Sequence, residues 1–149
     1  MKPALETVKA MVERKVSFVE RMGLQAIGLE RCAVKLIAPL RGNENHVGTM
    51  YAGALFTLAE MPGGALFLTT FDSSRFYPII KEMTIQFVRP ATTDVTVELV
   101  IPEEEARRIE TEAEQRGKAD FILEGELKDR SGTVVARSKG VYQLRVIGT

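Results

Sequence analysis

Glu60 is the residue whose surroundings point most directly to chemistry. It is the one carboxylate in residues 49–71, the most apolar stretch of the chain. A carboxylate in apolar surroundings costs free energy unless it is paired, hydrogen-bonded or protonated. Burial also raises the pKa of a carboxyl group, which makes it a better general base near neutral pH. Glu60 is therefore the first candidate for a catalytic group.

Small residues share a helix face with Glu60. If residues 49–71 form a helix, spacings of seven, three and four residues place Gly53, Thr57 and Gly64 on the side of Glu60. A ligand or another backbone can come close to such a face. Pro62 cannot donate a backbone N–H, so a kink near Glu60 is expected.

A polar loop at residues 41–48 leads into this helix and contains Asn45, Gly48 and the only histidine, His46. Backbone N–H groups at the helix N-terminus, made approachable by Gly48 and Gly53, would supply an oxyanion hole. His46 has two interpretations that the sequence leaves open: a hydrogen-bonding partner opposite Glu60, or a solvent-facing loop residue. By composition alone, Asn45 is equally a turn residue.

Composition limits the class of protein. A chain of 149 residues suggests one domain. With 20 basic and 20 acidic side chains it has no net charge that would attract nucleic acid or a membrane surface. One cysteine and one histidine permit no internal disulfide and leave few metal options. Residues 49–71 are nearly long enough to span a bilayer, but Glu60, Pro62 and three glycines argue against it. We expect a cytoplasmic, soluble protein without metal or cofactor.

The remaining elements follow from periodicity. A helical period covers residues 5–22, within an N-terminal helical segment 1–22, and a charged surface helix covers residues 102–116. Alternating apolar and polar residues predict strands, at residues 27–38, 76–89, 94–101, 119–128 and 133–146. Five strands can bury a long apolar helix only if the sheet curls around it, and short connections imply antiparallel pairing. The prediction is one α+β domain over residues 1–149, a curved antiparallel five-stranded sheet wrapped around the central helix 49–71.

Residues 45–60, NHVGTMYAGALFTLAE, resemble the signature of the phenylacetyl-CoA-type hotdog thioesterases. In that family a loop asparagine precedes a helix that carries Ala-Asp or Ala-Glu. Residues 87–90, FVRP, resemble the family strand that ends in Arg-Pro, and the helix before residues 117–119 resembles the DUF4442-like branch. The resemblance covers roughly residues 24–145 and implies the hotdog fold.

The resemblance also implies roles for residues. Glu60 matches the family's general base or nucleophile, Gly53 the glycine whose N–H polarises the thioester carbonyl, and Asn45 the loop residue near the attacking water. Tyr51 and Ala52 stand where the family has His-Gly, and His46 stands one residue before the usual loop histidine.

A substrate and an assembly follow from the same resemblance. The implied substrate is a thioester of coenzyme A or of an acyl carrier protein, and the implied assembly is a homodimer or homotetramer with the site at the subunit interface. The predicted substrate-binding residues are Gly53, Gly48, Tyr51, Thr57 and Arg89, of which Arg89 is a candidate for the charges of coenzyme A.

Two other functions remain open from the sequence. A 3-hydroxyacyl-thioester dehydratase would pair His46 with Glu60, which lies fourteen residues further along. A non-catalytic protein that binds acyl thioesters would fit the substituted His-Gly pair. Replacing Glu60 with glutamine separates these functions, because an enzyme loses turnover and keeps its ligand, whereas a binding protein barely changes.

Overall fold

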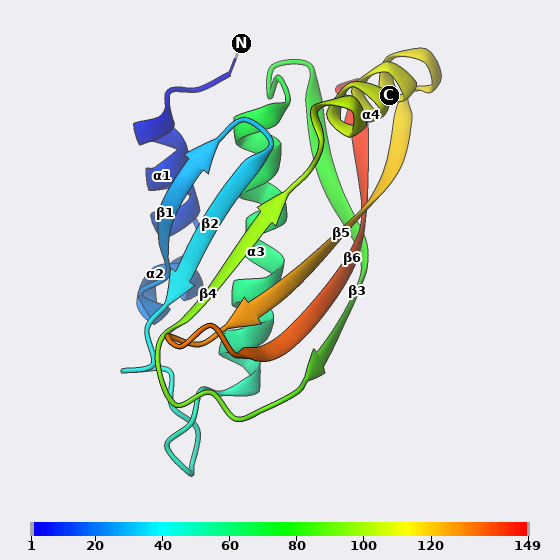
Figure 1. Cartoon of the computed structure of the whole chain (residues 1–149). Helices are drawn as coiled ribbons and strands as arrows, with labels where there is room; N and C mark the ends of the chain where they lie inside the picture. Colours follow the sequence, from blue (N-terminus) through cyan, green and yellow to red (C-terminus); the bar gives the residue numbers. More distant parts are fainter. Residues whose placement is uncertain (1, 149) are drawn as a thin grey trace.

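The computed structural model describes residues 2–148, which form four α-helices and six β-strands (Figure 1). The elements follow one another in the order α1 (Leu5–Arg14), α2 (Ser17–Met22), β1 (Gln25–Glu30), β2 (Ala33–Ala38), α3 (Ala52–Thr70), β3 (Phe76–Phe87), β4 (Val95–Val100), α4 (Glu103–Arg116), β5 (Lys118–Lys128) and β6 (Val134–Val146).

One antiparallel sheet holds all six strands in the order β1-β2-β4-β5-β6-β3. It curves around α3, which lies in its concave face (Figure 1). Inward residues of β5 alternate strictly with exposed ones, as expected for a sheet with one covered face. The predicted α+β architecture, a curved antiparallel sheet wrapped on one long helix, is confirmed.

The prediction of five strands is wrong by one. Residues 27–38, for which the alternation predicted one strand, contain a tight hairpin. The chain reverses at Arg31 and Cys32, between β1 and β2. Cys32 has φ +66°, a value that residues other than glycine rarely adopt. Tertiary hydrogen bonds hold it there: its N–H donates to Thr70 Oγ1 at 3.0 Å and its carbonyl accepts from Ile101 at 2.9 Å.

The predicted N-terminal helix is two helices. Val16 has an extended backbone, φ −100° and ψ 115°, which ends the first helix and begins the second. Both helices bury valine or methionine on one side, so the apolar period runs through the break. The buried residues are Val8, Val12, Val19 and Met22.

The central helix α3 begins at Ala52 and ends at Thr70, inside the predicted range 49–71. By length and hydropathy it could cross a membrane, but in this fold eleven of its 19 residues are buried, as in a core helix. Apart from Ala52 at its exposed first position, its other residues recur every three or four positions and form one incompletely covered face, which we call the open stripe of α3. The open stripe consists of Gly53, Phe56, Thr57, Glu60, Met61, Gly64 and Leu68.

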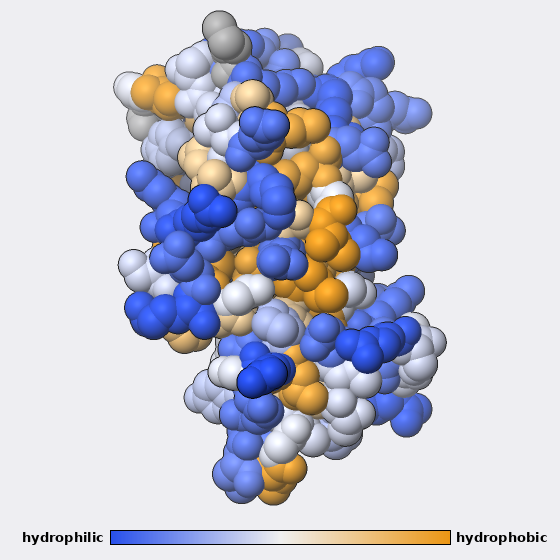
Figure 2. Space-filling model, turned by 90° about the vertical axis from the view of Figure 1, so that its left-hand side faces the viewer, coloured by the Kyte–Doolittle hydropathy of each residue, from blue (hydrophilic) through white to orange (hydrophobic). Residues whose placement is uncertain are grey.

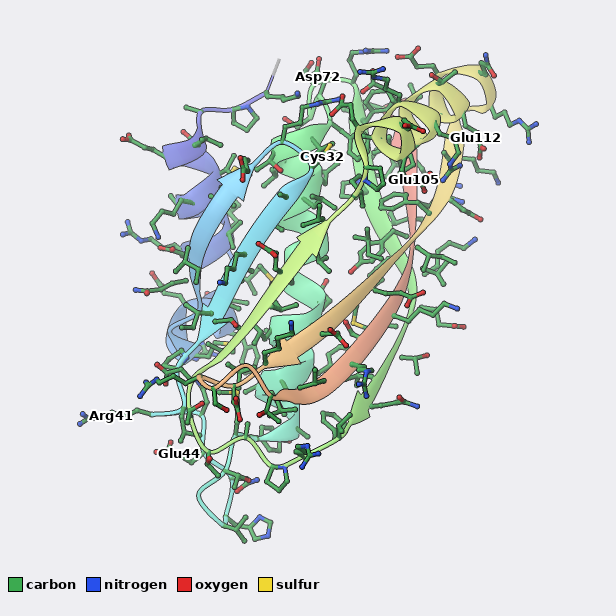
Figure 3. All side chains as sticks on the ribbon, in the orientation of Figure 1. Cys32, Arg41, Glu44, Asp72, Glu105 and Glu112 are labelled. Carbon is green, nitrogen blue, oxygen red and sulfur yellow. The ribbon has the colours of Figure 1, made fainter. Side chains whose placement is uncertain are left out.

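An arginine fork joins the end of α3 to the start of α4. Arg31 Nε donates to both Glu103 carboxylate oxygens at 3.0 Å, and Arg31 Nη1 donates to the Thr70 carbonyl at 2.7 Å. The fork therefore binds an otherwise orphaned carbonyl at the C-terminus of α3. Figure 3 shows Cys32 beside this junction, at the end of the sheet where α4 lies.

Replacing Arg31 with alanine is expected to lower the unfolding midpoint at pH 7. The Arg31 hydrogen bonds hold the pKa of Glu103 at about 2, below its usual 4.5. A lowered carboxyl pKa stabilises the fold above pH 4.5, and that stabilisation is lost as pH falls towards 2. Thermal unfolding at pH 7 and pH 3 should therefore show that the variant's midpoint falls further below that of wild type at pH 7.

Arg107→Ala is the control, because Arg107 Nε lies 3.7 Å from Glu103 and the Arg107 side chain is 73% exposed. Equal deficits for the two variants would contradict a special role of the fork.

Candidate active site

Glu60 lies in the middle of the open stripe of α3 and is partly buried. No hydrogen bond or ion pair joins it to any of residues 2–148. Desolvation by burial alone raises the pKa of its carboxyl group above the usual 4.5. The carboxylate therefore has free lone pairs, borders solvent, and is a stronger base than an ordinary surface glutamate.

The neighbours of Glu60 on the helix are small. Gly64 faces open space, since a Cβ added there would meet nothing within 4 Å. A Cβ on Gly63 would lie 2.6 Å from the hydroxyl of Tyr142, so that hydroxyl sits against the turn of α3 that follows Glu60. Tyr142, on β6, is only 4% exposed. The sequence does not single out Tyr142, because strand alternation shows only which way its side chain faces and the contact of its hydroxyl with α3 depends on the fold.

The N-terminus of α3 offers unpaired donors. No side chain caps it, and its first backbone hydrogen bonds run from Ala54 and Leu55 to the Tyr51 carbonyl, at 3.0 and 3.1 Å. The N–H groups of Ala52 and Gly53 have no acceptor among the described residues. Gly53 also makes room for the Tyr51 ring, because a Cβ there would lie 2.5 Å from a ring carbon. These N–H groups are suited to hydrogen-bond an oxyanion.

Asn45 organises the loop that precedes α3. Its Oδ1 accepts from the N–H groups of Val47 and Thr49, at 3.0 and 3.1 Å, and its Nδ2 donates to Thr49 Oγ1 at 2.8 Å. Gly48, with φ +88°, donates its N–H to the Asn45 carbonyl at 3.1 Å. His46 is exposed within this loop. Figure 3 places Arg41 and Glu44 of the same loop region at the end of the molecule opposite Asp72.

A cavity of about 320 Å³ lies between this loop, the start of α3 and the segment after β3. It brings Asn45 together with Arg89 and with the first turn of α3. The lining residues are Asn45, Thr49, Met50, Ala52, Leu55, Phe87, Val88, Arg89, Pro90 and Ala91. Glu60 is not among them, because it lies eight residues beyond Ala52, or ~12 Å along the helix axis.

Thr57 lies on the open stripe, between the first turn of α3 and Glu60. Its hydroxyl donates to the Gly53 carbonyl at 2.8 Å, one helical turn earlier. This bond leaves the hydroxyl oxygen able to accept but fixes its proton on the helix. One chain thus carries a cavity region (Asn45, Ala52, Arg89) and a separate carboxylate region (Glu60, Tyr142).

A second hollow is apolar and begins at Met61 and Gly64, within about one helical turn of Glu60. It has a volume of about 230 Å³ and lies between α1, α3 and Pro78 of β3. Met61 and Gly64 of the open stripe form part of its wall, together with Met11 and Phe67. Figure 2 shows apolar side chains gathered in the middle of the molecular face that carries α1.

A metal site of three or more His, Cys, Asp or Glu side chains does not occur within residues 2–148.

Comparisons with known proteins agree with this architecture. A Pseudomonas aeruginosa protein of unknown function, PA5026, described as a probable thioesterase, is 56% identical, with a TM-score of 0.95 and coverage of 98% of both chains. Thioesterase HI1161 of Haemophilus influenzae has a TM-score of 0.76 at 12% identity, covering 100% of this chain and 95% of its own. A variant of thioesterase PA1618 of P. aeruginosa has a TM-score of 0.74 at 18% identity, covering 99% and 97%.

Sequence comparison gave no match among curated proteins. The model of the family described as domain of unknown function DUF4442 matches residues 5–144. The resemblance of the sequence to this branch of the hotdog thioesterases is thereby confirmed. The chain belongs to the DUF4442 family and has the hotdog fold of its thioesterase relatives.

Proposed function

We propose that the protein hydrolyses acyl thioesters and that Glu60 is its general base. One observation carries this proposal: a partly buried, unpaired carboxylate with a raised pKa stands on the only incompletely covered face of the described central helix. Structural and family resemblance to thioesterases supports the same reaction class.

The chemistry needs few groups. Glu60 takes a proton from a water molecule, whose oxygen attacks the thioester carbonyl carbon. The negative charge that forms on the carbonyl oxygen is stabilised by backbone N–H donors. When the intermediate collapses, the carbon–sulfur bond breaks, and the thiol leaves with the proton that Glu60 held. The products are a carboxylic acid and a thiol.

The oxyanion donors of this reaction come from a second copy of the chain in our proposal. Gly53 lies seven residues before Glu60, or ~10 Å along the same helix, too far to serve the same carbonyl. A homodimer that places the open stripe of one chain beside the loop of the other would bring Glu60 to the partner copy's Asn45 and Gly53. A tetramer built from such dimers would keep the same sites.

Strand β3 supplies the surface for that dimer. It is an edge strand, and only Phe76 among its 12 residues is fully buried. Ile79, Ile80 and Phe87 are 36%, 39% and 52% exposed. A long, apolar, uncovered edge is a template for pairing with another strand, here β3 of the second copy.

The substrate is a thioester of coenzyme A or of an acyl carrier protein. Arg89 offers a positive charge, and Asn45 and Tyr51 offer polar groups, near the cavity at the start of α3. The apolar hollow beside Met61 and Gly64 suits the hydrocarbon part of the acyl group.

Thiol release from acyl-CoAs of varied chain length and aromaticity tests the proposed function. Wild-type protein should release thiol from at least one substrate, and Glu60→Gln should not. Absence of release from every acyl-CoA and from matching acyl carrier protein thioesters would refute hydrolysis. Turnover that survives in Glu60→Gln would refute the role of the carboxylate.

The dimer is tested by light scattering after gel filtration. Wild type should have twice the 16.5 kDa mass of one chain, or a larger even multiple. Ile80→Glu should reduce the mass because it places a charge on the β3 edge. Ile122→Glu should not, since Ile122 is 51% exposed on the central strand β5. A wild-type mass of one chain would contradict pairing through β3.

The dehydratase alternative needs His46 beside Glu60. His46 is exposed in the loop, and no hydrogen bond joins it to Glu60 within residues 2–148. Within the described residues of one chain, no feature of the site therefore favours that reaction over hydrolysis.

A further inference from the structure

The ring of Tyr142 is held in one position. It stacks on Phe121, with ring centroids 5.6 Å apart and an interplanar angle of 18°. The ring lies against a glycine on each side, Gly63 of α3 and Gly140 of β6. A Cβ on either glycine would lie 2.5 Å from a ring carbon. A side chain at either glycine would push the ring away, so both glycines preserve the place of the tyrosine.

The hydroxyl of Tyr142 has no bonding partner although the residue is almost fully buried. No hydrogen bond joins it to residues 2–148, and its oxygen is not sealed from solvent. A buried tyrosine ordinarily finds a partner for its hydroxyl. An unpartnered hydroxyl at the end of a fixed ring is therefore free to bind a ligand.

This hydroxyl borders Glu60. It touches the position of the Gly63 Cβ, and residues three apart on a helix are neighbours on its surface. Burial, and then the nearby charge of Glu60, raise the pKa of Tyr142. The hydroxyl therefore keeps its proton at neutral pH and is a hydrogen-bond donor beside an unpaired acceptor.

We propose that Tyr142 is a catalytic residue of the Glu60 site, whose hydroxyl donates a hydrogen bond to the carbonyl oxygen of the bound thioester. This inference rests on the proposed function. Glu60 accepts a proton from water while Tyr142 faces the oxygen on which negative charge develops. A polar ligand placed between them satisfies both unpaired groups at once, and Tyr142 adds a side-chain donor to the backbone N–H groups at the start of α3.

Tyr142→Phe tests the proposal because it keeps the ring and its stacking and removes only the oxygen. Losing one oxyanion donor costs about 10²–10³ in kcat. We expect a loss of that size, with KM changed less than about threefold and an unfolding midpoint that does not fall. The acid limb of the kcat/KM profile should stay in place. Tyr77→Phe on β3 is the matched control and should retain wild-type kcat.

Three outcomes would overturn the role of Tyr142 while leaving the proposed function intact. One is a kcat within about threefold of wild type. Another is a loss of kcat that is matched by a fall in the unfolding midpoint. The third is an acid limb that moves to higher pH, which would show that the hydroxyl only hydrogen-bonds Glu60.

If wild type hydrolyses no thioester, the proposed function fails, and binding decides the role of Tyr142. The probe is an acyl-CoA analogue with a methylene group in place of sulfur, which keeps the carbonyl and cannot be hydrolysed. Weaker calorimetric binding by Tyr142→Phe than by Tyr77→Phe would support a donor to the carbonyl. Equal binding by the two variants, or no binding by wild type, would overturn it.

Discussion

Glu60→Gln is expected to reduce kcat by about 10³-fold, within the 10²–10⁴-fold range that general-base catalysis contributes. Glutamine keeps the size and hydrogen-bonding capacity of the side chain but cannot take a proton from water. KM should change little, because the acyl chain and the thiol portion bind elsewhere. Steady-state thiol release, measured at saturating substrate, gives the ratio of the two kcat values.

The control for this variant is Glu104→Gln, an exposed glutamate on α4. It should keep wild-type kcat, which would show that loss of one negative charge is not the cause. Retention of more than a tenth of the activity by Glu60→Gln would contradict general-base catalysis. Tight binding of acyl-CoA by both wild type and variant, without turnover in either, would identify a binding protein.

Gly63→Ala and Gly64→Ala are expected to change stability in opposite directions, although the residues are adjacent. Alanine at Gly63 would place its Cβ 2.5–2.6 Å from the ring and hydroxyl of Tyr142, which is packed against Phe121. Overpacking of this kind should lower the free energy of unfolding by about 1–3 kcal/mol. Alanine at Gly64 meets nothing within 4 Å, and its helix propensity should raise that free energy by about 0.5–1 kcal/mol.

Urea unfolding of the two variants and wild type measures both effects. Gly63→Ala should also lose activity, since it displaces the Tyr142 hydroxyl next to Glu60. If both variants were more stable than wild type, Tyr142 would not occupy the space over Gly63, and its place in the site would be refuted.

The sequence predicted which residues share a face of α3, because helix geometry alone decides that. Spacings of three, four and seven residues grouped Gly53, Thr57, Gly64 and Glu60, and the structure leaves all four on the open stripe of α3. The charged surface helix predicted at residues 102–116 is likewise present as α4, which buries only Ala106, Ile109 and Ala113. Local periodicity suffices for such features because the helix itself sets the faces.

Features set by tertiary contacts could not be predicted. The reversal at Cys32 has no glycine, proline or asparagine to mark it. It depends on a hydrogen bond that Cys32 donates to Thr70 of α3 and on one that it accepts from Ile101. The hydroxyl of Tyr142 reaches Gly63 across 79 residues of sequence, through the curvature of the sheet. Neither contact leaves a signature in the neighbouring residues.

The dependence of kcat/KM on pH tests the central claim most directly. Glu60 acts as a base only when deprotonated, and burial raises its pKa above the usual 4.5, so activity should rise with pH through an inflection above that value. The residual activity of Glu60→Gln should lack this inflection. An inflection at or below 4.5, or the same inflection in both proteins, would show that another group is the base.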